Sequence, residues 1–444
     1  MVLFYSPPKK APSTPKAIKL TVHALDGFGQ GIAHYLGKTV FIKNALPGEQ
    51  VEVRLTEDKR QYAKAKVLKY LVKSEQRIAP NCRHYRICGG CEMQHMAIAM
   101  QHHVKAGALL GLIEKETGYK IDATDVKMIT STPYHYRRRA RLAIMYENNQ
   151  LVIGFRQLES KQIVDITVCP VLVEQLELQL VPLKGCLNGL KDRKALGHLD
   201  LIHTDSGTIV VLRHVRAFSE QDTKQLVDFA LQQKISFYLH GDELVHLVGN
   251  KEHYYCIGPL KLMFSPLDFI QVNEGVNLLM IEQAIDWLEL IPQDHVLDLF
   301  CGMGNFTLPI AMKCANVFGV EGVDALVDKA KFNAIFNRQY LLGDSEFFVS
   351  NLDHIDENSV WFTASINKVL LDPARPGANK VIAKIIQYSP THVVYISCNP
   401  ATLVRDSKIL LQAGYQIANI SILDMFPQTK HIESMLLFIK LGTK

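Results

Sequence analysis

The stretch His295-Val296-Leu297-Asp298-Leu299-Phe300-Cys301-Gly302-Met303-Gly304 decides how the C-terminal part of this chain folds. A short apolar run that ends in two glycines is typical of a buried parallel strand followed by a tight turn. Similar apolar runs follow, with helical spacing between them, at 317–321, 346–350, 368–372, 392–398, 417–423 and 435–441. This alternation predicts an α/β domain at 264–444, built as a doubly wound, mostly parallel sheet. Ligands of such sheets bind at the carboxyl ends of the strands.

The glycine turn after this first strand limits the kind of ligand that can bind there. A dinucleotide site of the G-x-G-x-x-G type needs a third glycine, and Thr307 stands at that position. Gly302 and Gly304 still allow the close approach of a smaller nucleoside such as S-adenosylmethionine. Glu321 closes the second strand, where an acidic side chain can hold ribose hydroxyls. The turn therefore favours a single nucleoside over a dinucleotide.

Length and composition indicate a multidomain globular protein. The chain has 444 residues, enough for about two to four domains, and 48% of them are hydrophobic. The formal net charge of +5 permits an anionic partner without requiring one. The segment 1–15 is rich in proline and lysine, which predicts a flexible basic tail and no signal peptide. No apolar stretch is long enough to span a bilayer, and the nine cysteines are spaced like reduced thiols. We therefore expect a soluble, cytoplasmic protein without membrane contact.

The segment 16–74 alternates apolar and polar residues in several short runs, separated by turns that contain glycine. This pattern predicts a small β-barrel of the OB type. Lys64, Lys66 and Lys69 give it a basic face, and the segment resembles a TRAM domain, an RNA-binding barrel. Taken alone, the same lysines would suit an ordinary solvated strand surface.

Three cysteines lie close together in the sequence Cys82-x5-Cys88-x2-Cys91, with two glycines between the last two. Glycines let the backbone fold several thiols around one centre. A fourth ligand is available in Cys169, which precedes a proline as iron–sulfur ligands often do. Spacing alone leaves two alternatives open, a structural zinc ion with four thiolates and a [4Fe–4S] cluster.

The segment 75–263 predicts a central domain of mixed α/β character that carries a basic patch. The patch is Tyr134-His135-Tyr136-Arg137-Arg138-Arg139-Ala140-Arg141, in which arginines follow tyrosines. Arginine binds phosphates and tyrosine stacks on bases, so this run is the best candidate for RNA contact. The alternative is a basic surface strand paired with acidic neighbours.

A thiol and a carboxylate stand near the end of the C-terminal domain. Cys398 lies in Tyr395-Ile396-Ser397-Cys398-Asn399-Pro400, where a proline ends an apolar strand, and Glu433 follows in His431-Ile432-Glu433. Such a pair can methylate C5 of a pyrimidine, because a thiolate that adds at C6 makes C5 nucleophilic and a base then removes its proton. The alternative for Cys398 is an inert buried thiol. That is the state expected of Cys186, Cys256, Cys301 and Cys314.

Together these motifs resemble the RNA (uracil-C5)-methyltransferase family, which uses S-adenosylmethionine, and the resemblance covers nearly the whole chain. It implies that Cys398 is the nucleophile and Glu433 the base, and that the target uridine is flipped out of the RNA into the active site. It also implies that the metal group is a [4Fe–4S] cluster, held by Cys82, Cys88, Cys91 and Cys169. The family's cofactor positions fall on Gln271, Phe300, Asn305, Glu321, Asn351 and Asp372.

The domain content narrows the substrate that this resemblance implies. Within the family, tRNA enzymes lack both the barrel and the cysteine cluster, while a second rRNA branch lacks only the barrel. The present chain has both, which implies the branch that acts on uracil(1939) of 23S rRNA. We expect a monomer, and the sequence suggests no protein partner. The same chemistry on another rRNA or tRNA uridine is the alternative.

Other classes of protein fit the sequence less well. A non-catalytic RNA-binding assembly factor would be expected to lose Cys398, Glu433 or the glycines of the turn, and all are present. A DNA cytosine methyltransferase would normally carry its nucleophile in Pro-Cys, where this chain has Ser-Cys-Asn-Pro. A radical or redox enzyme would be expected to show C-x3-C-x2-C, which differs from the cysteine spacing found here.

Overall fold

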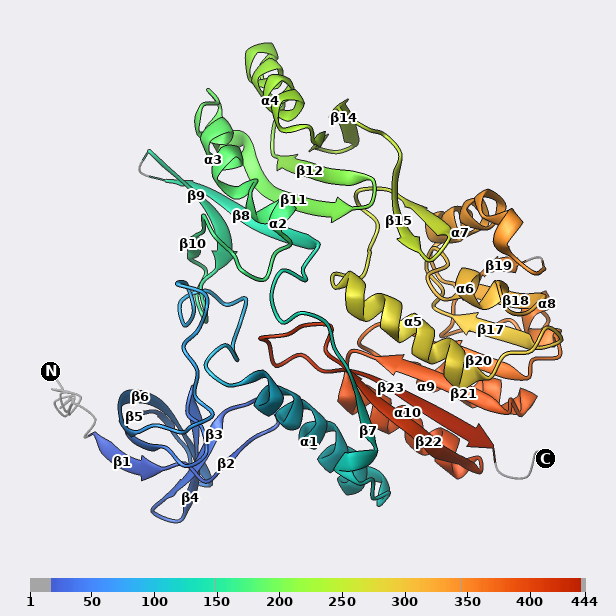
Figure 1. Cartoon of the computed structure of the whole chain (residues 1–444), viewed down its shortest axis with the longest axis horizontal. Coiled ribbons are helices and arrows are strands. Elements are labelled where there is room, and N and C mark those ends of the chain that lie inside the picture. Colours follow the sequence, from blue (N-terminus) through green and yellow to red (C-terminus); the bar gives the residue numbers. More distant parts are fainter. Residues whose placement is uncertain (1–16, 148, 344, 441–444) are drawn as a thin grey trace, which may run out of the picture. The chain divides into compact units, whose positions relative to one another are not determined.

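The computed structural model describes residues 17–440, apart from 148 and 344 (Figure 1). The expected basic tail at 1–15 and the last residue of the expected strand 435–441 lie outside the described residues. The chain divides into two compact units. The first contains the described residues up to Pro80 together with Glu92–Ala108, and the second contains Asn81–Cys91 together with the residues from Leu109 onward.

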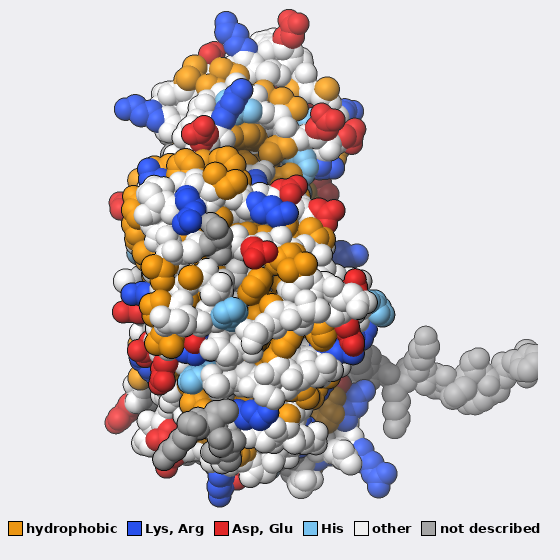
Figure 2. Space-filling view, turned by 90° about the vertical axis from the view of Figure 1, so that its right-hand side faces the viewer, with side chains coloured by type: hydrophobic (Ala, Val, Ile, Leu, Met, Phe, Trp, Pro, Cys, Tyr) orange, Lys and Arg blue, Asp and Glu red, His pale blue; other side chains and the backbone are white. Residues whose placement is uncertain are grey.

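The surface mixes hydrophobic, basic and acidic side chains. Figure 2 shows one face, on which both signs of charge are interspersed with hydrophobic groups. This mixture agrees with the modest net charge of +5. None of the helices within the described part of the chain is both long and apolar enough to cross a membrane.

The first unit is built on a six-stranded sheet with the order β1-β5-β6-β4-β3-β2. Alternate residues of its strands enter one core, as the alternating sequence predicts; Val51 and Val53 of β5 and Ala63 and Ala65 of β6 are almost fully buried. Strand β4 pairs in parallel with β6, and the other neighbours are antiparallel. The strands are β1 (Ile18–Thr21), β2 (Ala24–Leu25), β3 (Gly31–Tyr35), β4 (Lys38–Lys43), β5 (Gln50–Asp58) and β6 (Tyr62–Val72).

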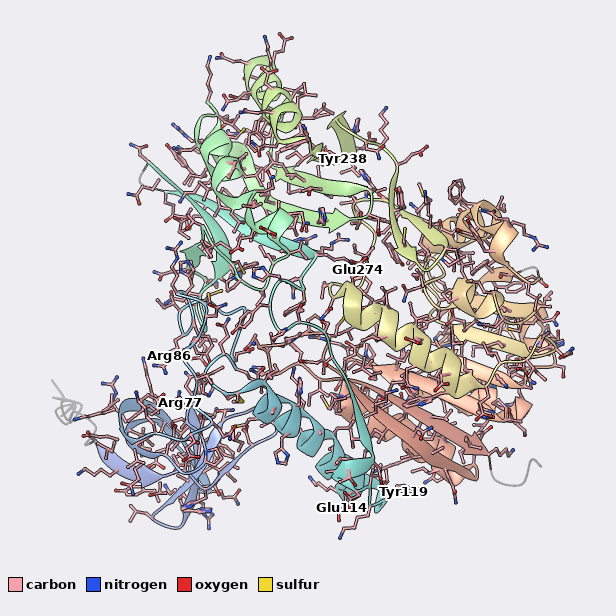
Figure 3. The ribbon with its side chains drawn as sticks, viewed as in Figure 1. Arg77, Arg86, Glu114, Tyr119, Tyr238 and Glu274 are labelled. Atoms are coloured by element: carbon pink, nitrogen blue, oxygen red, sulfur yellow. The ribbon has the colours of Figure 1, made fainter. Side chains whose placement is uncertain are left out.

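A buried ion pair stabilises this unit. The Glu49 side chain is fully buried, and Arg77 donates to both of its carboxylate oxygens, from Nε at 2.5 Å and from Nη2 at 2.8 Å. Figure 3 labels Arg77, whose Nη2 also donates to Asn44 O at 2.7 Å and whose guanidinium lies 4.4 Å from the centroid of the Tyr70 ring. Glu49 also accepts a 2.8 Å hydrogen bond from the backbone N–H of Leu46. The pair therefore connects the segment after β6 with the turn between β4 and β5.

The second unit contains two large sheets, of which the first has seven strands in the order β10-β9-β8-β11-β12-β13-β14. Strands β12 and β13 pair in parallel, and the other neighbours are antiparallel. The strands are β8 (Arg139–Glu147), β9 (Gln150–Arg156), β10 (Ile163–Asp165), β11 (Leu196–Thr204), β12 (Gly207–His214), β13 (Ser236–His240) and β14 (Leu244–Val248). The helices of this part are α2 (Glu174–Glu177), α3 (Leu180–Asn188) and α4 (Glu220–Gln233), whereas α1 (Ile98–Thr117) has residues in both units. This is a mixed α/β arrangement, as expected for the centre of the chain.

The second sheet has eight strands in the order β19-β18-β17-β20-β21-β23-β22-β7. From β19 to β21 all neighbours are parallel, and β23 is antiparallel to both β21 and β22. The doubly wound, mostly parallel sheet is thereby confirmed. Its strands are β17 (His295–Leu299), β18 (Asn316–Glu321), β19 (Ser345–Val349), β20 (Lys368–Leu371), β21 (His392–Ser397), β22 (Tyr415–Leu423) and β23 (Glu433–Lys440). The helices are α5 (Glu274–Leu288), α6 (Thr307–Ala311), α7 (Asp324–Phe336), α8 (Val360–Thr363), α9 (Asn379–Ile385) and α10 (Pro400–Gln412).

The eighth strand, β7 (Val126–Ile129), was not expected in this sheet. It comes from a segment that the sequence analysis assigned to the central domain, and it pairs in parallel with β22, from Ile420 to Leu423. Four residues are too few to show the period of a strand, so only the pairing with β22 reveals it.

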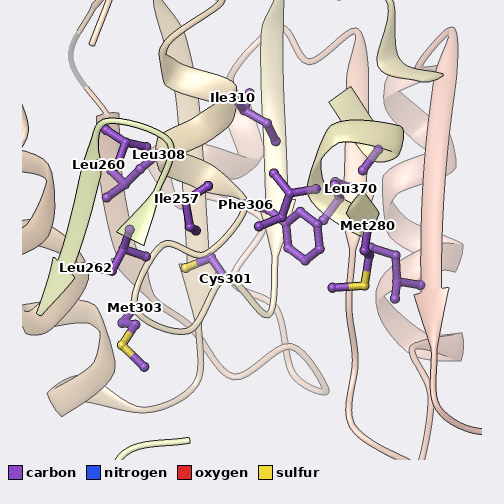
Figure 4. Close-up of a cluster of buried hydrophobic side chains, with 14 of the residues drawn as sticks. Ile257, Leu260, Leu262, Met280, Cys301, Met303, Phe306, Leu308, Ile310 and Leu370 are labelled. Atoms are coloured by element: carbon purple, nitrogen blue, oxygen red, sulfur yellow. The ribbon is translucent and has the colours of Figure 1, made fainter. Parts of the chain in front are cut away.

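A hydrophobic core lies beside the turn that follows β17 (Figure 4). Met303 and Phe306 of this turn are buried in the same cluster as Leu260 and Leu262 of β16 and Met280 of α5. Strand β16 (Leu260–Phe264) forms a separate hairpin with β15 (His253–Ile257). The β15–β16 hairpin and α5 therefore pack against the turn that follows β17, at the carboxyl end of this strand.

Candidate active site

The turn after β17 has a left-handed backbone that suits close approach by a ligand. Phe300, Gly302 and Gly304 all have positive φ, at 64°, 54° and 99°. A side chain at Gly304 would bring its Cβ within 3.1 Å of Leu308 Cγ, so both space and backbone favour glycine there. The backbone N–H of Phe300 donates to Val320 O at 2.8 Å, which holds the turn against β18. Phe300 is a non-glycine residue in this strained region, a feature that often marks a functional site.

Glu321, at the end of β18, organises the turn from the neighbouring strand. Its Oε2 accepts from the backbone N–H of Gly302 at 3.1 Å, and its Oε1 accepts from Gly322 at 2.8 Å and from Val323 at 3.2 Å. The carboxylate thus lies beside the glycine turn, at the position expected for a ribose-binding acid.

Asp298 adds a buried acid that the sequence analysis did not single out. Thr307 Oγ1 donates to its Oδ2 at 2.5 Å, while Oδ1 is buried and has no hydrogen-bond partner among the described residues. Burial raises the pKa of Asp298, and the nearby charges of Asp372 and Glu321 also raise it, to about 7 in all. Asp298 stands in the first strand, where its place next to the glycine turn was the only sequence signal. A buried carboxylate with an unsatisfied oxygen suits a ligand that carries positive charge.

Asn305 is held by a pair of neutral residues. It exchanges two amide hydrogen bonds with Asn277 of α5, at 3.2 Å and 3.1 Å, and its Oδ1 also accepts from the Tyr255 hydroxyl at 3.1 Å. Neither Asn277 nor Tyr255 was identified from the sequence, because each acts through Asn305 and lies in an ordinary helix or strand. The Asn305 amide therefore has a fixed orientation beside the glycine turn.

Gln271 precedes α5, whose N-cap is Asn273, with Oδ1 accepting from Val276 N at 3.2 Å. Two residues before Gln271, Phe269 is 68% exposed. Gln271 therefore lies in the connection between β16 and α5, outside the helix itself. Its carbonyl accepts a 2.9 Å hydrogen bond from Arg138 Nε.

Two of the expected RNA-binding arginines make internal contacts. The Arg138 side chain is 2% exposed and pairs with Glu274. Arg139 donates to the carbonyl oxygens of Asp268 and Pro266. The Arg141 side chain is 62% exposed and pairs with Asp200 at 2.9 Å, as the alternative of a paired surface strand predicts. Arg138 is thus enclosed and does not offer its charge to a phosphate at the surface.

Asn351 and Asp372 follow the ends of β19 and β20. Asn351 is exposed, and its Oδ1 accepts from the backbone N–H of Asp353 at 2.9 Å. Asp372 donates its backbone N–H to Leu299 O at 3.4 Å, and burial raises the pKa of its carboxyl group. Asp372 joins Asp298 and Glu321 beside the turn, since its charge acts on Asp298. The hydrogen bond of the Asn351 side chain goes instead to its own loop, at Asp353.

Cys398 lies between β21 and α10. Asn399 caps α10 through a 3.2 Å hydrogen bond from Ala401 N to its Oδ1, and its side-chain Nδ2 donates to Arg375 O at 3.0 Å. Burial raises the pKa of the Cys398 thiol, and the charges of Glu433 and Asp372 raise it further, while Arg375 opposes them. Thiol, carboxylates and guanidinium therefore act on one another in one site.

Strand pairing places Glu433 across from Cys398. Ser397 of β21 pairs with Ser434 of the antiparallel strand β23. The residue after Ser397 is Cys398 and the residue before Ser434 is Glu433, so these two face each other at the same end of the two strands. The Glu433 side chain is buried, and burial raises the pKa of its carboxyl group, with a further contribution from Asp372. The two residues expected to perform the chemistry are thus brought together, although they are 35 positions apart in the chain.

The four cysteines expected to bind a metal group interact electrostatically. Burial raises the pKa of the Cys169 thiol, and the charges of Cys91, Cys82 and Cys88 also raise it, to about 12 in all. The backbone N–H of Gly90 donates to Cys88 Sγ at 3.4 Å. Among the described residues, no group of three or more His, Cys, Asp or Glu side chains is arranged to hold a metal ion. A [4Fe–4S] cluster, whose irons occupy separate corners of a cube, needs its thiolates farther apart than a single ion does.

Comparison with known structures gives the class. The fold is similar to that of a tRNA (uracil-54, C5)-methyltransferase from Pyrococcus abyssi in complex with S-adenosyl-L-homocysteine, with a TM-score of 0.73 and 21% sequence identity. The likeness covers 95% of this chain and 100% of that one. This likeness shows that the two proteins share a fold.

Comparison with known sequences gives the family. Residues 113–441 match the tRNA (Uracil-5-)-methyltransferase family, and residues 16–68 match the TRAM domain. The 23S rRNA (uracil(1939)-C(5))-methyltransferase RlmD of Pectobacterium carotovorum subsp. carotovorum (strain PC1) is 48% identical over an alignment of 448 positions, which covers 99% of this chain and 98% of that protein. RlmD of Photorhabdus laumondii subsp. laumondii is 49% identical over 442 residues, 99% of this chain and 100% of that protein. The chain belongs to this family of RNA uracil-C5 methyltransferases, which confirms the resemblance and the TRAM domain.

Proposed function

We propose that this protein transfers a methyl group from S-adenosylmethionine to C5 of a uridine in 23S rRNA, at the uracil(1939) position. The relatives at 48% and 49% identity carry this activity in their names. The observation that supports the chemistry is the pairing of β21 with β23, which sets Cys398 opposite Glu433. Both lie at the end of the sheet where the glycine turn, Glu321 and Asp372 gather.

The two facing residues divide the reaction between them. The Cys398 thiolate adds to C6 of the uracil, and the electrons of the C5–C6 double bond move to form an enolate. C5 takes the methyl group, and S-adenosylhomocysteine leaves. Glu433 then removes the proton from C5, the double bond forms again, and the C6–S bond breaks to release Cys398. The products are 5-methyluridine, S-adenosylhomocysteine and one proton.

The raised pKa values explain why this site needs a positively charged partner. Burial raises the pKa values of the Cys398 thiol and the Glu433 carboxyl group. Without a ligand, both groups therefore hold their protons more strongly than exposed groups of the same kind. When bound, S-adenosylmethionine supplies the methyl group and a sulfonium charge. A cation near these groups lowers their pKa values, so the nucleophile and the base become ionised in the loaded enzyme. Asp298 and Asp372 add negative charge that favours such a ligand.

The cofactor-binding residues follow the strand ends. Six residues are assigned to S-adenosylmethionine, and all follow a strand end or the β16–α5 connection: Gln271, Phe300, Asn305, Glu321, Asn351 and Asp372. Glu321 would hold the ribose, since it lies beside the Gly302 turn. Asn351, exposed after β19, has the least structural support of the six.

The cysteine group is proposed to hold a [4Fe–4S] cluster on Cys82, Cys88, Cys91 and Cys169. The electrostatic interaction of Cys169 with the other three supports one shared group. The Gly90 N–H on Cys88 Sγ is the kind of hydrogen bond that stabilises a ligating thiolate. The cluster would fold the loop 82–91 onto the central sheet, because methyl transfer itself needs no electron.

The RNA is proposed to bind through the TRAM domain and to deliver one flipped uridine to Cys398. The TRAM match at residues 16–68 supports RNA contact by this barrel. A protein that acts on ribosomal RNA belongs in the cytoplasm, where its nine cysteines also stay reduced. We also propose that the protein acts as a monomer, without a protein partner.

The test is methyl transfer from labelled S-adenosylmethionine to unmodified 23S rRNA fragments and to tRNA. Wild-type protein and Cys398→Ala are compared, with Cys314→Ala as the control for loss of a buried thiol that lies away from the site. We expect label at C5 of one uridine in 23S rRNA with the wild type and the control, and none with Cys398→Ala. Label on tRNA alone would overturn the substrate, and no label on any RNA would overturn the enzymatic proposal in favour of a binding factor.

A further inference from the structure

Arg138 lies between two of the residues assigned to S-adenosylmethionine, Gln271 and Asn305. Its side chain is 2% exposed, and its contacts lead in two directions. One direction follows hydrogen bonds to the segment that carries Gln271. The other passes through an aromatic ring to Asn305.

The contacts to the Gln271 segment are made by both backbone and side chain. The backbone N–H of Arg138 donates to Val272 O at 2.8 Å, and Nε donates to Gln271 O at 2.9 Å. Nη1 donates to Glu274 Oε1 at 3.0 Å, in the first turn of α5 (Figure 3). Arg138 thus binds the carbonyl oxygens of Gln271 and Val272 and the side chain of Glu274, so the two peptide planes that follow Gln271 have little freedom to rotate.

The contact toward Asn305 passes through Tyr255. The Arg138 guanidinium lies 5.0 Å from the centroid of the Tyr255 ring. The Tyr255 side chain is 2% exposed, and its hydroxyl donates to Asn305 Oδ1 at 3.1 Å. A buried cation stacked on this ring restricts where the hydroxyl can point. The orientation of the Asn305 amide therefore depends on Arg138.

Burying a guanidinium group so completely costs free energy, because the charge loses its hydration. The Arg138 guanidinium has few partners that could compensate for this loss. Within the described part of the chain, Glu274 is the one carboxylate that pairs with the Arg138 guanidinium, and the Glu274 side chain is 46% exposed. One guanidinium nitrogen, Nη2, is buried without a hydrogen-bond partner among the described residues. A hydrophobic side chain of similar volume is often at least as stable as a buried charge. Arg138 is therefore poorly explained by stability alone.

We propose that Arg138 is a positioning residue for cofactor binding, which fixes Gln271 and Asn305 in the arrangement that S-adenosylmethionine requires. The inference rests on the proposed function. Arg138 acts through these two residues and does not touch the reacting atoms. It also connects the cofactor to the strand β8, which begins at the next residue, Arg139.

The test measures binding of S-adenosylhomocysteine by calorimetry, which needs neither RNA nor catalysis. Arg138→Met keeps the length of the side chain and removes the donors, and we expect it to weaken binding by about 10- to 100-fold. Arg138→Lys keeps the charge but can reach only one of the acceptors, so we expect a smaller loss. In methyl transfer, Arg138→Met should raise KM for S-adenosylmethionine more than it lowers kcat at saturation.

Lys368→Met provides a control for the loss of a buried cation. Lys368 pairs with Asp294 at 2.8 Å and donates to Glu289 O at 2.6 Å, at the opposite end of the sheet from the site. This variant should lower the melting temperature without changing the affinity for S-adenosylhomocysteine. If Arg138→Met is destabilised in the same way but binds as tightly as the wild type, the inference is wrong.

Tyr255→Phe tests the second direction without removing the arginine. It deletes only the hydroxyl that binds Asn305, and we expect binding to weaken by about 3- to 10-fold. If Arg138→Met does not fold, Tyr255→Phe becomes the deciding test. An unchanged affinity of Tyr255→Phe for S-adenosylhomocysteine would then overturn the inference. A wild-type protein that binds no S-adenosylhomocysteine would instead overturn the proposed function, so the two failures are distinguishable.

Discussion

The Tyr395 hydroxyl donates a 2.7 Å hydrogen bond to Asp406 Oδ2, and both side chains are fully buried. The same Oδ2 accepts from the backbone N–H of Ala378 at 2.7 Å, and Oδ1 accepts from Arg405 Nε at 2.7 Å. Tyr395 belongs to β21, Asp406 to α10, and Ala378 to the loop that follows β20. One carboxylate thus holds the strand that leads to Cys398 against the loop that contains Arg375.

Tyr395→Phe should therefore destabilise the protein by about 1–3 kcal/mol, because a buried carboxylate loses one of its donors. Tyr415→Phe is the matched control, since its hydroxyl donates at 2.9 Å to a neutral acceptor, Pro390 O, and its side chain is also buried. That change should cost only about 0.5–1.5 kcal/mol. Urea unfolding of the two variants measures the difference. If both variants lost the same free energy of unfolding, the charge of Asp406 would add nothing to its hydrogen bond with Tyr395.

Glu433→Gln should separate catalysis from stability. Methyl transfer should fall by about 10²–10⁴-fold, because glutamine cannot accept the C5 proton. The thermal stability of the variant, in contrast, should exceed that of the wild type at high pH. The pKa of Glu433 is raised in the folded protein above its ordinary 4.5, so its protonated form is favoured and the wild type loses stability as pH rises above that value. Glutamine does not ionise, and the variant should melt at a higher temperature than the wild type at pH 8 to 9.

The same two proteins should melt alike below pH 4.5, where Glu433 is protonated in both the folded and the unfolded state. Thermal unfolding across this pH range is the measurement. A variant that is less stable than the wild type at high pH would show that Glu433 is ionised and well paired in the resting protein.

A covalent complex should accumulate in the Glu433→Gln variant. Without the base, C5 keeps its proton after methylation, so the bond between Cys398 and C6 cannot be released. Denaturing gel electrophoresis with labelled RNA should show one band that retains both protein and RNA, and Cys398→Ala in the same background should remove it. If the band persists in the double variant, a different nucleophile forms the bond.

The sequence predicted the catalytic sheet well because parallel strands buried on both faces read as continuous apolar runs. The sequence singles out Cys398 and Glu433 because their residue types suit the chemistry, and their roles stay a prediction. It could not predict Arg138, Tyr255 or Asn277, since each acts through a backbone carbonyl or another side chain that only the folded chain brings near. The basic patch also shows what sequence alone does not reveal, namely which of its arginines are buried. A run of arginines looks alike in sequence whether its members face solvent or, as Arg138 does, lie buried under a neighbouring segment.

Metal analysis should distinguish the two groups that four thiolates can hold. We expect protein purified without oxygen to contain about four irons and four sulfides per chain, with little zinc. Cys169→Ala should lose the iron and lower the melting temperature, because Cys169 is the buried member of the group. Cys186→Ala is the control, since burial also raises the pKa of Cys186, to about 11, but it lies outside the group. About one zinc per chain in place of iron would show that the group is a mononuclear site.

The buried pair of Glu49 and Arg77 should control the stability of the first unit. Arg77→Met leaves the Glu49 carboxylate buried without its cation, which should cost about 3–5 kcal/mol. Burial alone would raise the pKa of Glu49, but the hydrogen bonds from Arg77 and from the backbone of Leu46 outweigh it and lower the pKa below 4.5. The pair therefore contributes its full stability above pH 4.5, and that contribution is lost as pH falls through the lowered value.

Hydrogen exchange of strand β5 (Gln50–Asp58) in the intact protein measures this local stability as a function of pH. Protection of β5 should fall on acidification in the wild type and be low at every pH in Arg77→Met. Lys64→Met is the control, because Lys64 pairs with Glu57 at 2.7 Å in a solvent-exposed position. Screening by water makes such a pair weak, so its removal should leave β5 protected. Equal loss of protection in both variants would mean that burial of the Glu49 pair gives it no special role.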